Sequence, residues 1–71
     1  MNRYLVIIEE SATGYSAFLP DLPGCIAAGS TREDIEKAMR EGVEFHLEGL
    51  RESGEPVPPP RSTATYVEVA A

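Results

Sequence analysis

Few side chains of this sequence could take part in catalysis or bind a metal ion, and they lie far apart along the chain. Metal-dependent hydrolysis of a phosphodiester needs several carboxylates that converge on metal ions about 3.5–4 Å apart. Glu9 falls at the end of one expected strand and Glu68 in another, and neither has an acidic neighbour on the same face. Asp21 lies in a proline-rich loop, where a carboxylate commonly caps a turn. The sequence therefore predicts no catalytic residue, no metal site and no cofactor.

The single cysteine and the single histidine are also poor candidates for catalysis. A cysteine nucleophile needs a basic or histidine neighbour, and no such residue lies near Cys25 in the sequence. We interpret Cys25 as a small buried apolar side chain. His46 falls in the apolar stripe of an expected helix, either as a half-buried histidine or as an interface residue whose protonation weakens assembly. Phe45 falls outside that stripe, so we expect Phe45 and His46 to form an oligomer contact.

Length and charge restrict the class of protein. The 71 residues form one domain, 1–71, and carry 6 basic and 12 acidic side chains, a net charge of −6. A negative chain repels phosphate backbones, so we expect no direct binding to nucleic acid. The longest apolar run, residues 4–8, is far short of the ~20 residues of a membrane span, and the start shows no secretory signal. A lone cysteine cannot form an internal disulfide, so together with the missing secretory signal it predicts a cytoplasmic protein. Because no membrane span is present, we also expect no membrane contact.

The first half of the chain predicts three strands. Residues 3–9 are rich in β-branched and aromatic types, which indicates a strand buried on both faces. Residues 10–14 form a turn, and residues 15–19 form the second strand of a hairpin. After a rigid loop that contains two prolines and a glycine, residues 25–28 form a short third strand.

An amphipathic helix follows the third strand. A capping box opens it, either from Ser30 to Glu33 or, in the alternative frame, from Thr31 to Asp34. Between residues 31 and 53 the apolar positions recur at helical spacing and share one side. They are Ile35, Ala38, Met39, Gly42, Val43, His46, Leu47 and Leu50.

The proline-rich segment after the helix returns the chain to the sheet. Residues 55–60 cannot be helical and favour polyproline II, which spans about 3.1 Å per residue. Residues 63–69 alternate in polarity and predict a fourth strand, parallel to a neighbour because the helix makes a crossover. The fold class is therefore α+β with the order βββαβ.

One stretch of the sequence resembles a known family. Residues 14–25 read GYSAFLPDLPGC, and residues 29–34, at the helix start, read GSTRED. Together with the proline-rich helix exit, these resemble the HicB-like antitoxins, over residues 4–69. The resemblance implies a partial ribonuclease-H-like fold: a three-stranded antiparallel meander, one helix, and a fourth strand parallel to the first. We call the most distinctive part the marker loop and expect it to be structural; it comprises Pro20, Asp21, Leu22, Pro23, Gly24 and Cys25.

The resemblance also implies a partner. HicB-like domains bind a small basic ribonuclease toxin of the HicA type and mask its active surface. Members of the family commonly add a C-terminal segment that binds operator DNA. Only Ala70 and Ala71 follow Val69 in this sequence, so we expect no operator binding by this chain.

The outer face of the expected helix is acidic in its second half. Glu41, Glu44, Glu48 and Glu52 line one side, and the like-charged pairs four residues apart each cost a few tenths of a kcal/mol. Such a row is either a solvated face or a docking stripe for a basic partner.

These observations predict a non-catalytic protein-interaction domain. A small chain without a disulfide or a metal buries little surface, so we also expect a homo-oligomer. Our hypothesis is an antitoxin that masks a small basic HicA-type toxin. The alternative is a stand-alone homo-oligomeric domain of the same fold that binds another protein or a small ligand and has no toxin partner.

Overall fold

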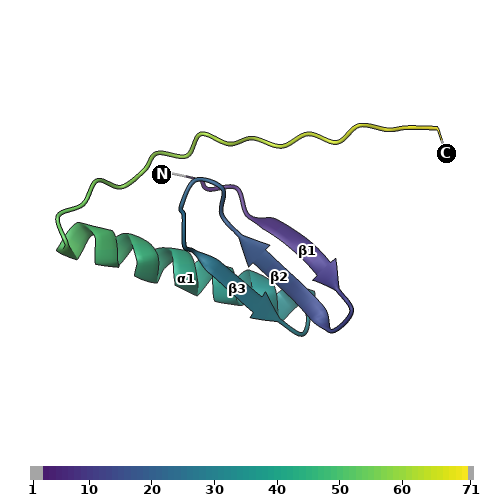
Figure 1. Cartoon of the computed structure of the whole chain (residues 1–71), viewed down its shortest axis with the longest axis horizontal. Helices are drawn as coiled ribbons and strands as arrows, with labels where there is room; N and C mark the ends of the chain where they lie inside the picture. The colour runs from purple at the N-terminus through teal and green to yellow at the C-terminus, as the bar shows by residue number, and fades with distance from the viewer. Residues whose placement is uncertain (1–2, 71) are drawn as a thin grey trace.

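The computed structural model describes residues 3–70, which form a small sheet covered on one face by a helix (Figure 1). The strands are β1 (Ile7–Ser11), β2 (Gly14–Phe18) and β3 (Ile26–Gly29). Each pairs antiparallel with the next, so the sheet is a meander of order β1-β2-β3. The helix α1 (Arg32–Glu52) follows β3 and packs against β2 and β3. The predicted α+β class and its first four elements are confirmed.

The first hairpin is tighter than the sequence suggested. The β1–β2 ladder continues to the pair Ser11–Gly14, so two residues make the turn instead of the predicted five. Gly14 has a φ of +148°, and a Cβ built there would lie 2.5 Å from the carbonyl oxygen of Gly29. Glycine is required at this position because the backbone of Gly29, at the end of β3, and of Ser30 passes directly beside it.

Six buried side chains form the core. They are Ala17, Leu19, Leu22, Cys25, Ile35 and Met39. Leu22 from the marker loop and Ile35 from α1 are completely buried, at 0% exposure. The expectation that the first strand is buried on both faces is wrong, because residues 4–8 are only half-buried. Their strand pairs on one side with β2 and lies at the edge of the sheet.

The start of α1 follows the alternative of the two capping frames. The Thr31 hydroxyl accepts a hydrogen bond from the backbone N–H of Asp34, at 3.0 Å. The apolar stripe faces the sheet as predicted, with Ile35 and Met39 buried and Val43 and Leu47 packed against the core.

The segment after α1 returns along the molecule but does not pair as a strand. Residues 55–70 are extended, and the chain runs back above the helix and past the N-terminal end (Figure 1). Residues 63–69 are all exposed, so the fourth strand expected there is not formed within this chain. Hydrogen bonds to the marker loop hold residues 61 and 62, and the residues after them do not form a ladder with β1.

The requirement for glycine at position 14 makes a direct test of the hairpin. Gly14→Ala adds a Cβ in a φ region that L-residues avoid, against the Gly29 backbone, so we expect a loss of about 1–3 kcal/mol in the free energy of unfolding. Urea denaturation followed by circular dichroism measures it. Gly49→Ala is the matched control: nothing lies within 4 Å of its added Cβ, and alanine in a helix should stabilise by about 1 kcal/mol. Equal effects of the two substitutions would contradict the hairpin geometry.

Candidate protein-interaction surfaces

The marker loop is compact and buries Leu22 in the core. Backbone hydrogen bonds run from the N–H of Leu22 to the carbonyl of Leu19, at 3.3 Å, and from the N–H of Cys25 to that of Leu22, at 3.1 Å. A third joins the N–H of Leu19 to the carbonyl of Cys25, at 3.3 Å. Gly24, with a φ of +88°, makes the reversal that returns the chain to β3. The loop therefore buries two of its side chains, Leu22 and Cys25, next to the buried Leu19, while Pro20 and Pro23 stay exposed.

Asp21 has a role that its place in the sequence does not reveal. Its Oδ2 accepts hydrogen bonds from the backbone N–H groups of Arg61, at 2.8 Å, and Ser62, at 2.9 Å. Its Oδ1 accepts a third, at 2.8 Å, from the Ser62 hydroxyl. The Tyr4 hydroxyl also donates to the carbonyl of Pro58. We call these contacts the C-terminal clamp, because together they fix the returning segment to the marker loop and the N-terminal residues.

The hydrogen bonds of the clamp stabilise the charged form of Asp21. Those from the Ser62 and Arg61 backbone, followed by that from the Ser62 hydroxyl, lower the pKa of the Asp21 carboxyl below its ordinary value. The simpler turn-capping role expected from the sequence misses this contact, because its donors lie 40 and 41 residues away. No local pattern in the sequence signals a contact of that separation.

Cys25 and the acids that the sequence offered for catalysis lie in different surroundings. Cys25 is buried in the core, and burial raises the pKa of its thiol, as for a structural rather than a reactive cysteine. Glu9 is exposed on β1, and Glu68 is exposed on the unpaired C-terminal segment. Across residues 3–70, no three His, Cys, Asp or Glu side chains are grouped so that they could share a metal ion. Nor is α1 long and apolar enough to cross a membrane.

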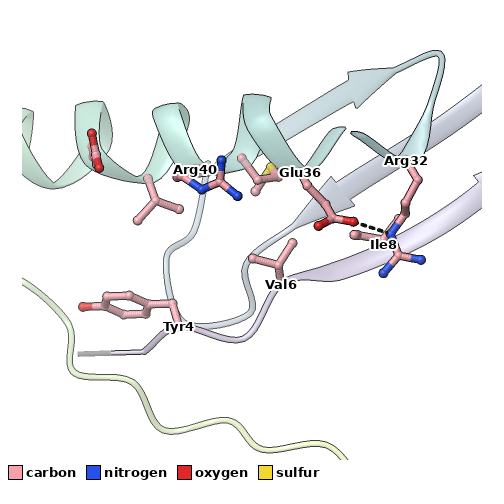
Figure 2. A pocket seen from close by; sticks show the side chains of 9 residues that line it. Tyr4, Val6, Ile8, Arg32, Glu36 and Arg40 are labelled. Carbon is pink, nitrogen blue, oxygen red and sulfur yellow. Dashed lines mark ion pairs between the residues drawn. The ribbon is translucent and has the colours of Figure 1, made fainter. Parts of the chain in front are cut away.

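A shallow groove separates β1 from α1 (Figure 2). Its volume is about 560 Å³. Apolar side chains from β1, from the residues that precede it and from α1 line it: Tyr4, Val6, Ile8, Met39 and Val43. Figure 2 shows Val6 pointing up toward α1 from the strand side. The groove is thus an apolar surface beside the unpaired edge of the sheet.

Charged side chains from α1 form the rim of this groove. Arg32 and Glu36 make an ion pair of 3.0 Å, drawn as a dashed line in Figure 2. The same i,i+4 spacing also allows pairs of Glu33 with Lys37 and of Glu36 with Arg40, which the structure does not form. Because Glu36 turns back to Arg32, Arg40 extends over the groove without an ion pair to any residue that the structure describes. Both groups of the pair are about half exposed, so its contribution to stability is small.

The four glutamates of the predicted docking stripe lie on the solvent side of α1. Glu41, Glu44, Glu48 and Glu52 are all exposed, and none makes an ion pair with another described residue. Glu44 also lines the groove, so the two surfaces meet there. The structure thereby presents a continuous acidic strip along the second half of α1.

The structure separates the two residues expected to share an oligomer contact. Phe45 is 81% exposed and is a helical neighbour, three or four residues away, of Glu41 and Glu48. His46 is half-buried, among the apolar positions of α1 that turn toward the sheet. Their joint role in an oligomer stays a prediction, while the position of Phe45 places an aromatic side chain within the acidic strip.

Comparison with known proteins places this architecture in a family. Residues 4–70 match the model of the HicB-like antitoxins of bacterial toxin–antitoxin systems. This chain belongs to the HicB-like antitoxin family. The resemblance found in the marker loop is therefore confirmed, and it extends over nearly the whole sequence.

Relatives of the family differ in length. An uncharacterized protein of Haemophilus phage HP1 is 34% identical over 64 residues, which are 90% of this chain and 48% of the phage protein. The antitoxin HicB 2 of Photorhabdus laumondii is 34% identical over 97% of this chain and 50% of its own length. The chain thus spans about half of these two relatives. A UPF0150 protein of Thermoplasma acidophilum, 31% identical, is matched over 97% of this chain and 99% of its own length.

Solved structures share the fold. A chain of a HicA3 and HicB3 toxin–antitoxin complex superposes with a TM-score of 0.72 at 37% identity, covering 83% of this chain and 70% of that one. The crystal structure of the antitoxin HicB3 gives a TM-score of 0.69 at 35% identity, over 84% of this chain and 44% of that one. The α+β arrangement of this HicB-like domain is that of the family.

The lowered pKa of Asp21 predicts how the clamp of this HicB-like chain responds to pH. A carboxyl whose folded-state pKa is depressed stabilises the fold above its unfolded-state pKa of 3.8, and this contribution is lost as pH falls through the lower folded value. The protection factors of the Arg61 and Ser62 amides, which compare each exchange rate with the intrinsic rate at the same pH, should therefore be high at neutral pH and lost below that value. Asp21→Asn should accelerate exchange of both amides at neutral pH.

A matched variant separates the clamp from a general effect of charge. Glu10→Gln removes one negative charge from an exposed position on β1 and should leave exchange at Arg61 and Ser62 unchanged. Slow exchange at both amides in Asp21→Asn would show that the carboxylate does not hold the segment.

Proposed function

We propose that this chain is a non-catalytic antitoxin of the bacterial cytoplasm that binds a small basic HicA-type ribonuclease toxin and masks its RNA-binding surface. The observation that carries the proposal is the exposed acidic strip of α1 with Phe45 inside it, on a chain of the HicB-like family. The structural relative from a HicA3 and HicB3 toxin–antitoxin complex supports a partner of this class.

Charge explains why a basic partner suits this face. Residues 30–55 carry eight acidic and four basic side chains, a net −4 of the −6 on the whole chain. A ribonuclease toxin must attract a phosphate backbone and is therefore positive where it binds RNA. An acidic strip attracts the same surface, which accelerates association and places the antitoxin over the RNA site.

Phe45 supplies the apolar part of such an interface. Buried aromatic side chains surrounded by polar groups contribute most of the binding energy in many protein complexes. At 81% exposure Phe45 has most of its ring available to a partner, and Glu41 and Glu48 are its neighbours on α1. We expect the toxin to bury Phe45 while the glutamates surround it.

Blocking a toxin in this way requires no reaction. The scaffold has only to hold α1 rigid, and the burial of Ile35 and Met39 against the sheet does so. The domain acts as a homo-oligomer in this proposal, because six buried side chains are a small core for a chain with no disulfide.

The groove beside β1 favours one second candidate function. Its apolar lining and its volume of about 560 Å³ are within the range of small-molecule sites. The alternative is thus a stand-alone homo-oligomeric domain that binds a small ligand or another protein and has no toxin partner. A genome without a small basic reading frame beside this gene would favour it.

The acidic strip can be tested with the product of the adjacent gene where that product is a small basic protein of the HicA type. Glu44→Gln with Glu48→Gln should raise the Kd measured by calorimetry about tenfold and reduce its dependence on salt. Glu9→Gln with Glu10→Gln removes the same charge from β1 and should leave the Kd within twofold. Equal effects of the two pairs would contradict the strip as the binding site, and a toxin that stays active with the wild-type chain would refute neutralisation.

Phe45 distinguishes the toxin interface from the oligomer contact. If the toxin buries Phe45, Phe45→Ser should weaken toxin binding by about 2 kcal/mol and leave the solution mass of the chain alone unchanged. A loss of solution mass with unchanged toxin affinity would instead assign Phe45 to the oligomer.

A further inference from the structure

The C-terminal residues 63–69, which we call the arm, expose apolar side chains to an unusual degree. Tyr66 is 99% exposed, Val67 78% and Val69 80%. The arm is extended, and polar and apolar types alternate along it. An extended segment of this kind loses conformational freedom and gains no burial unless it joins a sheet.

The sheet offers one edge that matches the arm. β1 has a strand neighbour only in β2 among the residues that the structure describes, so its other edge presents backbone N–H and C=O groups without a strand partner. Native proteins usually cover such an edge. The groove lies beside it, lined by Val6 and Ile8 on the strand side and Met39 and Val43 on the helix side. Seven extended residues span about 23 Å, enough to cover residues 4–10.

The C-terminal clamp directs the arm away from the sheet of its own chain. Asp21 fixes Arg61 and Ser62 by three hydrogen bonds immediately before the arm begins. Residues 62–64 then pass beside residues 3–6 without forming a ladder with them. Figure 1 shows the rest of the arm diverging from β1 toward its free end.

We propose that the arm supplies the fourth strand of a second copy of this chain. In this exchange the arm of one chain pairs in parallel with β1 of the other, and the second arm returns the contact by two-fold symmetry. Val67 and Val69 share one face of the arm and pack over Val6 and Ile8 in the groove of the second copy. The arm then covers both the free edge of β1 and the apolar groove of the second copy, and its own apolar side chains become buried.

This inference extends the homo-oligomer of the proposed function and is independent of its toxin. Strand exchange leaves the acidic strip of α1 facing solvent, except at Glu44 on the rim of the groove. A dimer of this kind presents two acidic strips.

Solution mass by light scattering tests the exchange on the chain alone. The wild type should have at least twice the 7.7 kDa of one chain, and Val67→Asp with Val69→Asp should reduce it to a monomer. Tyr66→Asp with Ala70→Asp places the same charge on the opposite face of the extended C-terminal segment, at the arm and just after it, and should preserve the oligomer. Circular dichroism checks that α1 persists in both. A monomeric wild type, or equal behaviour of the two pairs, would overturn the exchange.

Disulfide trapping distinguishes exchange from closure of the arm on its own sheet. With Cys25→Ala as the background, chains that carry Val67→Cys are mixed with chains that carry Ile8→Cys. We expect a crosslinked species of both chains under oxidation, and none when the partner carries Ile26→Cys on β3, which is 76% exposed at the opposite edge. A chain with both Val67→Cys and Ile8→Cys that crosslinks only within itself would overturn the proposal. Toxin neutralisation by such a monomer would leave the antitoxin function standing.

Discussion

The burial of Leu22 by the marker loop is the contact on which most of this small structure depends. Six side chains form the core, and Leu22 and Ile35 are its two completely buried members. Leu22 reaches the core because Gly24 reverses the chain and the loop satisfies its own backbone hydrogen bonds. The same loop turns the Asp21 carboxylate outward, where it fixes Arg61 and Ser62. One short segment therefore joins the sheet to α1 and determines where the C-terminal residues leave the domain.

The small size of the core leaves one edge of the sheet only partly buried. None of the six core residues comes from β1: its Ile8 packs against the core while half-buried, Glu9, Glu10 and Ser11 are exposed, and its outer edge has no strand beside it in the described chain. The groove is an apolar surface that is open to solvent, and the arm exposes apolar side chains to solvent. Their complementarity explains why a domain of this size would gain stability from a second copy, since burial of the arm adds the apolar area that the single chain lacks.

The interaction surfaces are divided by charge. The solvent side of α1 is acidic with one aromatic side chain, whereas the groove side is apolar with Arg40 above it. In our two proposals a basic partner binds the first surface and an apolar strand the second, so the two contacts would meet only at Glu44. In the proposed function this α+β domain serves as a scaffold for binding, in line with the general finding that fold and function are separable.

The sequence by itself determined the elements of this protein and its family. Periodicity located the helix and its buried stripe, and the marker loop identified the HicB-like family because its prolines and glycine specify one local conformation. It also located the acidic strip, since spacing along a helix fixes which residues share a face. Only the tertiary structure decided the contact of Asp21 with Ser62, the ion pair of Glu36 and the fate of the fourth strand. The contact of Asp21 and the course of the C-terminal segment depend on where residues 40 positions apart meet in space, which no local pattern encodes. The ion pair depends on which of its two neighbours four residues away Glu36 turns to.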